Sequence, residues 1–125
     1  MPESTPFLTT VPVRWSDFDS YGHVNNLAFL EFEQEARVEF ARATLERGGV
    51  EPATVVRHLE IDYLRAILAD TREVLVETVI IAFGNTSYTI RQSIKDQHGH
   101  IAAVLQTVMG LYDLDESRSI QLTPQ

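Results

Sequence analysis

The chain has 125 residues, no cysteine and a formal net charge of −8. This length predicts a single domain over residues 1–125, and the missing cysteines exclude disulfides and a thiol nucleophile. The negative charge argues against nucleic-acid binding, which requires basic surface. Because the start lacks a secretory pattern and no apolar run is long enough to span a bilayer, we expect a cytoplasmic protein without a membrane partner.

The first half of the chain reads as a strand, a turn-rich segment and a helix. Residues 7–15 are rich in β-formers, and residues 16–25 are rich in turn-forming types. Over 26–47 the apolar positions recur at helical spacing, with a helix stop at Gly48-Gly49. The face expected to be buried carries Phe29, Phe32, Ala36 and Phe40.

The second half alternates in the manner of strands joined by short turns. Turn signals occur at 84–86 and 96–100. Short connections favour antiparallel pairing. The order predicts an α+β fold in which one antiparallel sheet wraps around one long helix. Strands are expected at 59–63, 72–83, 88–94 and 101–113.

The segment between the first strand and the helix concentrates chemically active residues. It reads Trp-Ser-Asp-Phe-Asp-Ser-Tyr-Gly-His-Val-Asn-Asn over residues 15–26. Its acids and histidine supply proton-transfer or nucleophilic groups, and its glycine permits a sharp bend. Its asparagines suit a helix start, where free N–H groups favour negative charge. A carboxylate beside an anion site is the minimum equipment for acyl transfer.

This segment, extended by Arg14 before it and by Phe29 and Glu35-Ala36-Arg37 after it, resembles the signature of hot-dog-fold acyl thioesterases. More narrowly, it resembles the 4-hydroxybenzoyl-CoA thioesterase family and its acyl-ACP thioesterase relatives. Weaker matches follow at residues 60–65, 84–87 and 96–99. The resemblance implies a single hot-dog thioesterase domain, with a five-stranded antiparallel sheet around a central helix. It also implies a homodimer or homotetramer with active sites at the subunit boundary.

The resemblance makes Asp19 the catalytic carboxylate, because it is the second acid of the Asp-x-Asp pair. It attacks the thioester carbonyl or acts as general base on a water, and the sequence leaves both open. The alternative is a turn residue that accepts hydrogen bonds from nearby backbone N–H groups. Asp17 is expected to support the turn, with orientation of Asp19 as the alternative.

The rest of the segment carries further expected site residues. His23 matches an acid/base histidine of acyl-ACP thioesterases, although Tyr21 replaces the asparagine that those enzymes place two residues earlier. The alternative for His23 is hydrogen bonding that shapes the turn. The backbone N–H of Asn26 is expected to bind the thioester oxygen, while Gly22 allows close approach of the substrate. Asn25 and Asn26 read equally well as helix caps.

For substrate binding we expect Gly22, Asn25, Arg65 and Ser87. The family implies basic and hydroxyl groups, such as those of Arg65 and Ser87, on the sheet near the dimer seam. Ala66 stands where the family often has proline, which leaves the local strand path open. The His98-Gly99-His100 run fits an exposed turn better than a metal site, since no third ligand is near in sequence. No metal or other cofactor is expected, and coenzyme A enters as part of the substrate. Further basic candidates, which the sequence does not rank, are Arg57, Arg91 and Lys95.

The function predicted from the sequence is hydrolysis of an acyl-CoA, or of an acyl-ACP, in lipid metabolism. Two other classes stay open. One is an enoyl-CoA hydratase or dehydratase on the same fold, and the other is an acyl-CoA-binding protein without catalysis, including a scaffold whose site is a relict.

Overall fold

The computed structural model describes residues 5–44, 53–113 and 118–119. The helix stop expected at Gly48-Gly49 lies outside these residues. Beside a 3-10 turn, η1 (Trp15–Asp17), there is one long helix, α1 (Asn26–Thr44). The strands are β1 (Phe7–Pro12), β2 (Thr54–Tyr63), β3 (Glu73–Phe83), β4 (Ser87–Lys95), β5 (Ile101–Asp113) and β6 (Arg118–Ser119).

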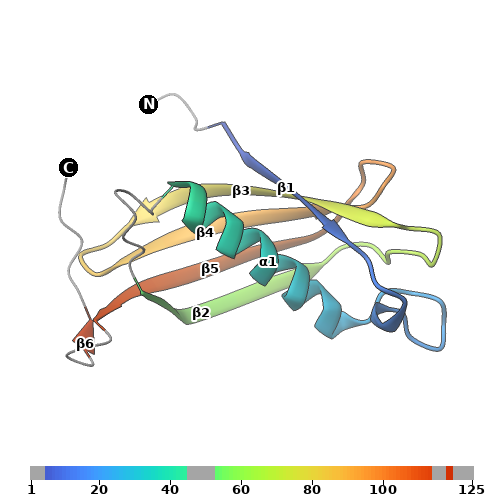
Figure 1. Ribbon diagram of the computed structural model, residues 1–125, viewed down its shortest axis with the longest axis horizontal. Coiled ribbons are helices and arrows are strands. Elements are labelled where there is room, and N and C mark those ends of the chain that lie inside the picture. Colours follow the sequence, from blue (N-terminus) through green and yellow to red (C-terminus); the bar gives the residue numbers. More distant parts are fainter. Residues whose placement is uncertain (1–4, 45–52, 114–117, 120–125) are drawn as a thin grey trace.

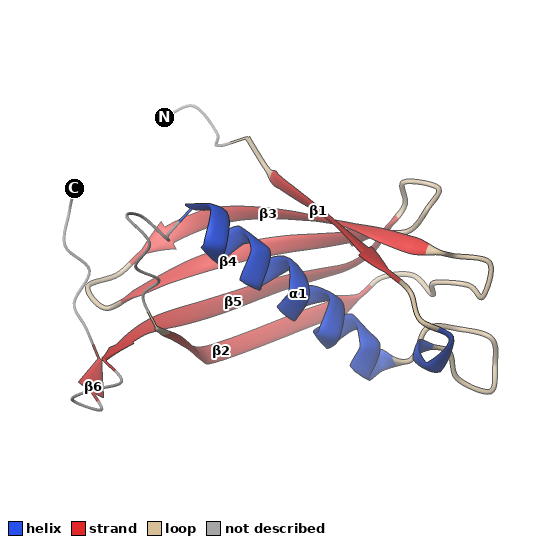
Figure 2. Cartoon of the chain, in the orientation of Figure 1, coloured by secondary structure: helices blue, strands red, loops and turns tan. Residues whose placement is uncertain are grey.

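The strands form one antiparallel sheet in the order β1-β3-β4-β5-β2, and the two-residue β6 pairs with the end of β5. Figure 1 shows α1 lying across one face of this sheet, where it contacts β1, β3 and β4. Figure 2 shows that long loops gather at the N-terminal end of the helix. None of the helices in the described ranges is long and apolar enough to cross a membrane.

The helix face expected to be buried forms the core of the described chain. Phe32 and Ala36 are almost completely buried, and Phe29 and Phe40 nearly so. Phe29, Phe32 and Ala36 belong to one buried cluster with Val76 of β3, and Phe40 belongs to a second cluster with Ile90 of β4. Each buried phenylalanine contributes about 1.5–3 kcal/mol of transfer free energy. The sheet therefore holds α1 by its apolar stripe, and the N-terminal end of the helix projects toward the loops.

Two strand boundaries differ from the sequence prediction by more than one residue. The first strand ends at Pro12 rather than at residue 15, because the chain turns into η1. There the Arg14 N–H donates to Asp17 Oδ2 at 2.8 Å instead of to a neighbouring strand. β2 begins at Thr54, earlier than expected, because a bulge at Arg57 interrupts the side-chain alternation on which the prediction depended.

Candidate active site

Asp19 and His23 are the two ends of a tight turn that enters the helix. The Asp19 N–H donates to the His23 carbonyl at 2.8 Å, and Phe18 and Val24 form a bridge on either side. Asp19 Oδ1 accepts the N–H groups of Tyr21 at 2.9 Å and His23 at 3.2 Å. Asp19 is exposed, and no described residue donates a hydrogen bond to its Oδ2. One carboxylate oxygen thus shapes the turn, and the other is available to a substrate.

The same turn occurs a second time in the chain, between β4 and β5. Asp96 Oδ1 accepts the N–H groups of His98 at 2.9 Å and His100 at 3.0 Å. The glycines of the two turns, Gly22 and Gly99, have φ of 77° and 83°. Burial raises the pKa of Asp96, but the His100 and His98 N–H groups and the His100 ring outweigh it and hold the pKa below its ordinary value. A turn role therefore explains one oxygen of Asp19 without any chemistry.

The start of α1 leaves two backbone donors free. Asn25 Oδ1 accepts the Ala28 N–H at 2.9 Å, and Asn25 Nδ2 donates to the Asp17 carbonyl at 2.9 Å. Asn25 is therefore the cap, whereas Asn26 is the first helical residue and its side chain caps nothing. In the described chain the N–H groups of Asn26 and Leu27 donate to no protein acceptor. Free N–H groups at a helix N-terminus attract negative charge.

A groove of about 340 Å³ brings several predicted residues together at this end of the helix. Its lining includes three residues expected from the motif and one from the segment that follows β2: Asp19, His23, Asn26 and Arg65. Tyr63, at the end of β2, also lines the groove and was not predicted. Its position on the inward face with Leu59 and Ile61 was readable from the alternation, but its proximity to Asn26 depends on the tertiary fold.

Other expected residues lie beside the groove or far from it. Gly22 and Asn25 build its turn and its helix cap, respectively. Ser87 begins β4 next to the β3–β4 hairpin, at the opposite end of the sheet from the start of α1 (Figure 1). In a single chain, Arg65 and Ser87 therefore do not meet.

Asp17 has the supporting role expected from the sequence. Its side chain is 3% exposed, and its two oxygens accept the Arg14 N–H and the Arg14 guanidinium. The Asp17 carbonyl accepts both the backbone N–H and the side chain of Asn25. Asp17 thus connects η1 to the helix cap and does not line the groove.

The chain path after β2 is also defined, although Ala66 replaces the proline frequent in the family. The N–H groups of Leu64 and Arg65 both donate to the Ala102 carbonyl, at 2.8 and 3.1 Å. The Val24 N–H then donates to the Ile67 carbonyl at 2.8 Å. The segment after β2 therefore forms a wall of the groove.

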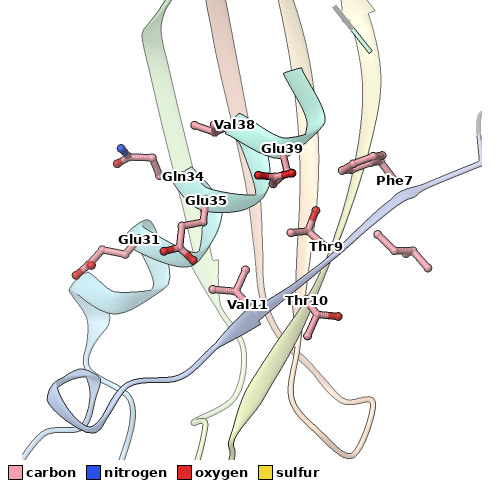
Figure 3. Close-up of a pocket in the computed structure, with 10 residues that line it drawn as sticks. Phe7, Thr9, Thr10, Val11, Glu31, Gln34, Glu35, Val38 and Glu39 are labelled. Atoms are coloured by element: carbon pink, nitrogen blue, oxygen red, sulfur yellow. The ribbon is translucent and has the colours of Figure 1, made fainter. Parts of the chain in front are cut away.

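A larger groove of about 710 Å³ lies between β1 and the outer face of α1 (Figure 3). Figure 3 shows Glu35 and Glu39 on the helix side and Thr9 and Val11 on the strand side. Glu39 pairs with Arg42 at 3.1 Å. This groove contains none of the residues predicted for the site, so size alone does not locate the chemistry.

The middle of α1 carries a buried acid. Glu33 is 2% exposed, and its Oε1 lies 3.3 Å from Arg37 Nη1. Burial raises the pKa of Glu33, and the charge of Arg37 offsets this only in part. Glu33 Oε2 has no hydrogen-bond partner. Glu33 does not line the groove at the helix N-terminus, so it is a feature of the core rather than of the site.

The described residues contain no group of three or more His, Cys, Asp or Glu side chains that is able to hold a metal ion. His98 and His100 stand 6.2 Å apart between ring centroids, and both are exposed. The His100 ring faces Asp96 at 3.4 Å and the His98 ring faces Asp70 at 3.9 Å.

Comparison with known proteins identifies the family. A family model described as the thioesterase-like superfamily matches residues 13–125. The chain belongs to the thioesterase-like superfamily. A relative from Bacillus subtilis, the uncharacterized protein YsmA, is 25% identical over 123 residues, which are 98% of this chain and 83% of that protein.

Solved structures agree with the thioesterase-like fold. A predicted thioesterase from Bacillus stearothermophilus is 27% identical, covers 94% of this chain and 88% of its own, and superposes with a TM-score of 0.82. A thioesterase complexed with coenzyme A and Zn, from Thermus thermophilus, is 31% identical, with coverage of 96% and 93% and a TM-score of 0.81. The predicted hot-dog architecture, a five-stranded antiparallel sheet with one long helix, is confirmed.

Proposed function

We propose that this protein hydrolyses an acyl-CoA, or an acyl-ACP, to the free acid and the thiol, with Asp19 as nucleophile or general base. The observation that carries the proposal is the groove in which Asp19 and the start of α1 meet. There an Asp19 carboxylate oxygen and the Asn26 N–H, neither with a hydrogen-bond partner in the described chain, border the same groove, and the N–H of Leu27, which also lacks an acceptor, follows in the same helical turn. The superfamily supports thioester hydrolysis, and the coenzyme A bound to the Thermus thermophilus thioesterase supports the CoA ester as substrate.

The proposed reaction places the thioester oxygen at the N–H groups of Asn26 and Leu27. Asp19 Oδ2 attacks the carbonyl carbon, or it removes a proton from a water that attacks. The negative charge then develops on an oxygen that faces two donors and the positive end of the helix dipole. The C–S bond breaks, the thiol leaves as a thiolate, and His23 in the same groove is the proposed proton donor to it. In the nucleophile route, water then hydrolyses the mixed anhydride.

The test uses thiol release from a panel of acyl-CoAs, from acetyl to palmitoyl with benzoyl and phenylacetyl, by the wild type and Asp19→Asn. An amide oxygen still accepts the two turn N–H groups, but it neither attacks nor accepts a proton. We expect turnover to fall by at least about 100-fold. Asp96→Asn is the matched control, because it makes the same change in the second turn.

Three results would contradict the proposal. Turnover that survives Asp19→Asn moves the chemistry elsewhere, with His23 next to be tested. Binding of acyl-CoA without turnover by the wild type establishes a binding protein. Hydration of an enoyl-CoA without thiol release establishes the hydratase alternative.

We also propose that the working unit is a homodimer, which pairs further into a tetramer or remains alone. β2 is an edge strand of the sheet. Because the Leu64 N–H donates to the Ala102 carbonyl, alternate residues of β2 bond β5, and the N–H groups of Leu59, Ile61 and Tyr63 point away from it. Two-fold pairing of such edges places the Ser87 end of one sheet beside the Arg65 end of the other. We propose that Arg65 of one protomer and Ser87 of its partner then line the same substrate site.

A further inference from the structure

Tyr63 contacts the first turn of α1 at two points. Its hydroxyl donates to the Asn26 carbonyl at 3.1 Å. Its ring packs edge-on against Phe29, with ring centroids 5.2 Å apart and an interplanar angle of 89°. Asn26 and Phe29 are three residues apart and so lie on the same side of the helix. The Tyr63 side chain thus fixes the position of the first helical turn along the helix axis and its rotation about that axis. This is the turn that carries the free N–H groups.

The backbone of Tyr63 is itself firmly placed. Tyr63 ends β2 opposite Ala103, and the next two N–H groups both bond the Ala102 carbonyl. The Phe29 ring that it meets is 3% exposed and belongs to the main core. The contact therefore connects a sheet strand to the helix start through two rigid elements, whereas the Asp19 turn approaches the same helix from the loop side.

The geometry also separates Tyr63 from the chemistry. Its hydroxyl proton is committed to the Asn26 carbonyl, so it is not available to the leaving thiolate. Donors that stabilise an oxyanion act through fixed placement, and a small displacement lowers the rate without weakening binding of the ground state. A residue that holds the donors should therefore affect kcat more than KM.

We propose that Tyr63 is the positioning residue that holds the N–H groups of Asn26 and Leu27 where the thioester oxygen binds. This inference depends on the proposed thioesterase function. It gives the strand β2 a role in placing the oxyanion donors. Tyr63 lies in β2 and is not part of the motif that precedes the helix.

The test compares Tyr63→Phe, which keeps the ring and removes the hydroxyl, with Tyr63→Leu, which removes both contacts. We expect Tyr63→Phe to lower kcat about tenfold with KM within about twofold of wild type, and Tyr63→Leu to lower kcat further. Tyr21→Phe is the matched control, because the Tyr21 ring is 84% exposed and its hydroxyl has no partner in the described chain.

A second measurement does not require activity. NMR order parameters of the Asn26 and Leu27 N–H vectors should fall in Tyr63→Phe and remain unchanged in Tyr21→Phe. An inactive wild type would overturn the proposed function, and the order parameters would still decide whether Tyr63 holds the turn. Unchanged kcat in Tyr63→Phe, a change in KM alone, or unchanged order parameters would overturn the inference.

Discussion

Two adjacent asparagines at the start of α1 have different roles, one through its side chain and the other through its backbone. Asn25 uses its side chain, which binds the Ala28 N–H and the Asp17 carbonyl. Asn26 uses its backbone, whose N–H is free and whose carbonyl accepts the Tyr63 hydroxyl. From the sequence both residues read equally well as caps, and the resemblance added a backbone role for Asn26. The structure shows that Asn25 is the side-chain cap and that Asn26 is the first helical residue.

The distinction predicts opposite outcomes for two alanine variants. Asn25→Ala loses the cap and should lower the free energy of unfolding by about 1 kcal/mol. Asn26→Ala keeps its backbone and loses no side-chain hydrogen bond, so its stability and its turnover should stay close to wild type. Urea unfolding followed by circular dichroism measures the first effect, and thiol release measures the second. Equal destabilisation by both changes would show that the cap is assigned wrongly.

At the scale of elements, hydrophobic periodicity was enough to predict the helix and the five longer strands, but not the two-residue β6 in the polar tail. Phe29, Phe32, Ala36 and Phe40 repeat every three or four residues, and all four are buried. The prediction was wrong where local hydrogen bonds override periodicity. The Arg14 N–H donates to Asp17 instead of to a neighbouring strand, so β1 ends early. The bulge at Arg57 interrupts the side-chain alternation, so the first part of β2 was not predicted.

The same reasoning explains which residues of the candidate site could be predicted from the sequence. Asp19, His23 and Asn26 lie within eight residues of one another, so one turn and one helix start suffice to bring them into one groove. Tyr63 arrives from a strand that is adjacent only in the folded chain. Ser87 is separated from the groove by the length of the sheet, and no local pattern reveals this.

The burial of Glu33 in α1 predicts that the free energy of unfolding depends on pH. The pKa of Glu33 in the folded protein is raised above its ordinary 4.5 by burial. The stabilisation that Glu33 contributes to the folded state is therefore fully present below its ordinary pKa. It is lost as the pH rises through the raised pKa of the folded state. We expect Glu33→Gln to gain stability relative to wild type as the pH rises from about 4 to 7. Urea unfolding across this range measures the difference, and parallel curves would contradict the prediction.

At the scale of the whole molecule, the two edges of the sheet predict different effects of proline. Ile61→Pro removes an N–H that points away from β5, so it should prevent pairing of two β2 edges. Thr10→Pro is the control on the opposite edge: the Val13 N–H donates to the Arg72 carbonyl, so the Thr10 N–H also points outward. Circular dichroism establishes that both variants fold.

Light scattering then gives the mass of each protein. We expect wild type and Thr10→Pro at twice, or four times, the chain mass of 14.1 kDa, and Ile61→Pro at 14.1 kDa. Activity should fall on dilution of the wild type, because the proposed dimer takes Arg65 and Ser87 of one site from different protomers. A monomeric wild type, or an Ile61→Pro variant of unchanged mass, would show that β2 is not the seam.

The repeated turn changes how an acid in this position is interpreted. Both turns need an oxygen acceptor, at Asp19 and at Asp96, so the turn alone is a sufficient reason for an aspartate at either position. What separates the two acids is the surroundings of the second oxygen. Both acids line a groove, but the second oxygen of Asp96 faces the His100 ring at 3.4 Å, whereas that of Asp19 has no partner in the described chain and the Asp19 groove lies at a helix start. Inheritance of activity in this superfamily is therefore better judged from what surrounds the turn than from the aspartate within it.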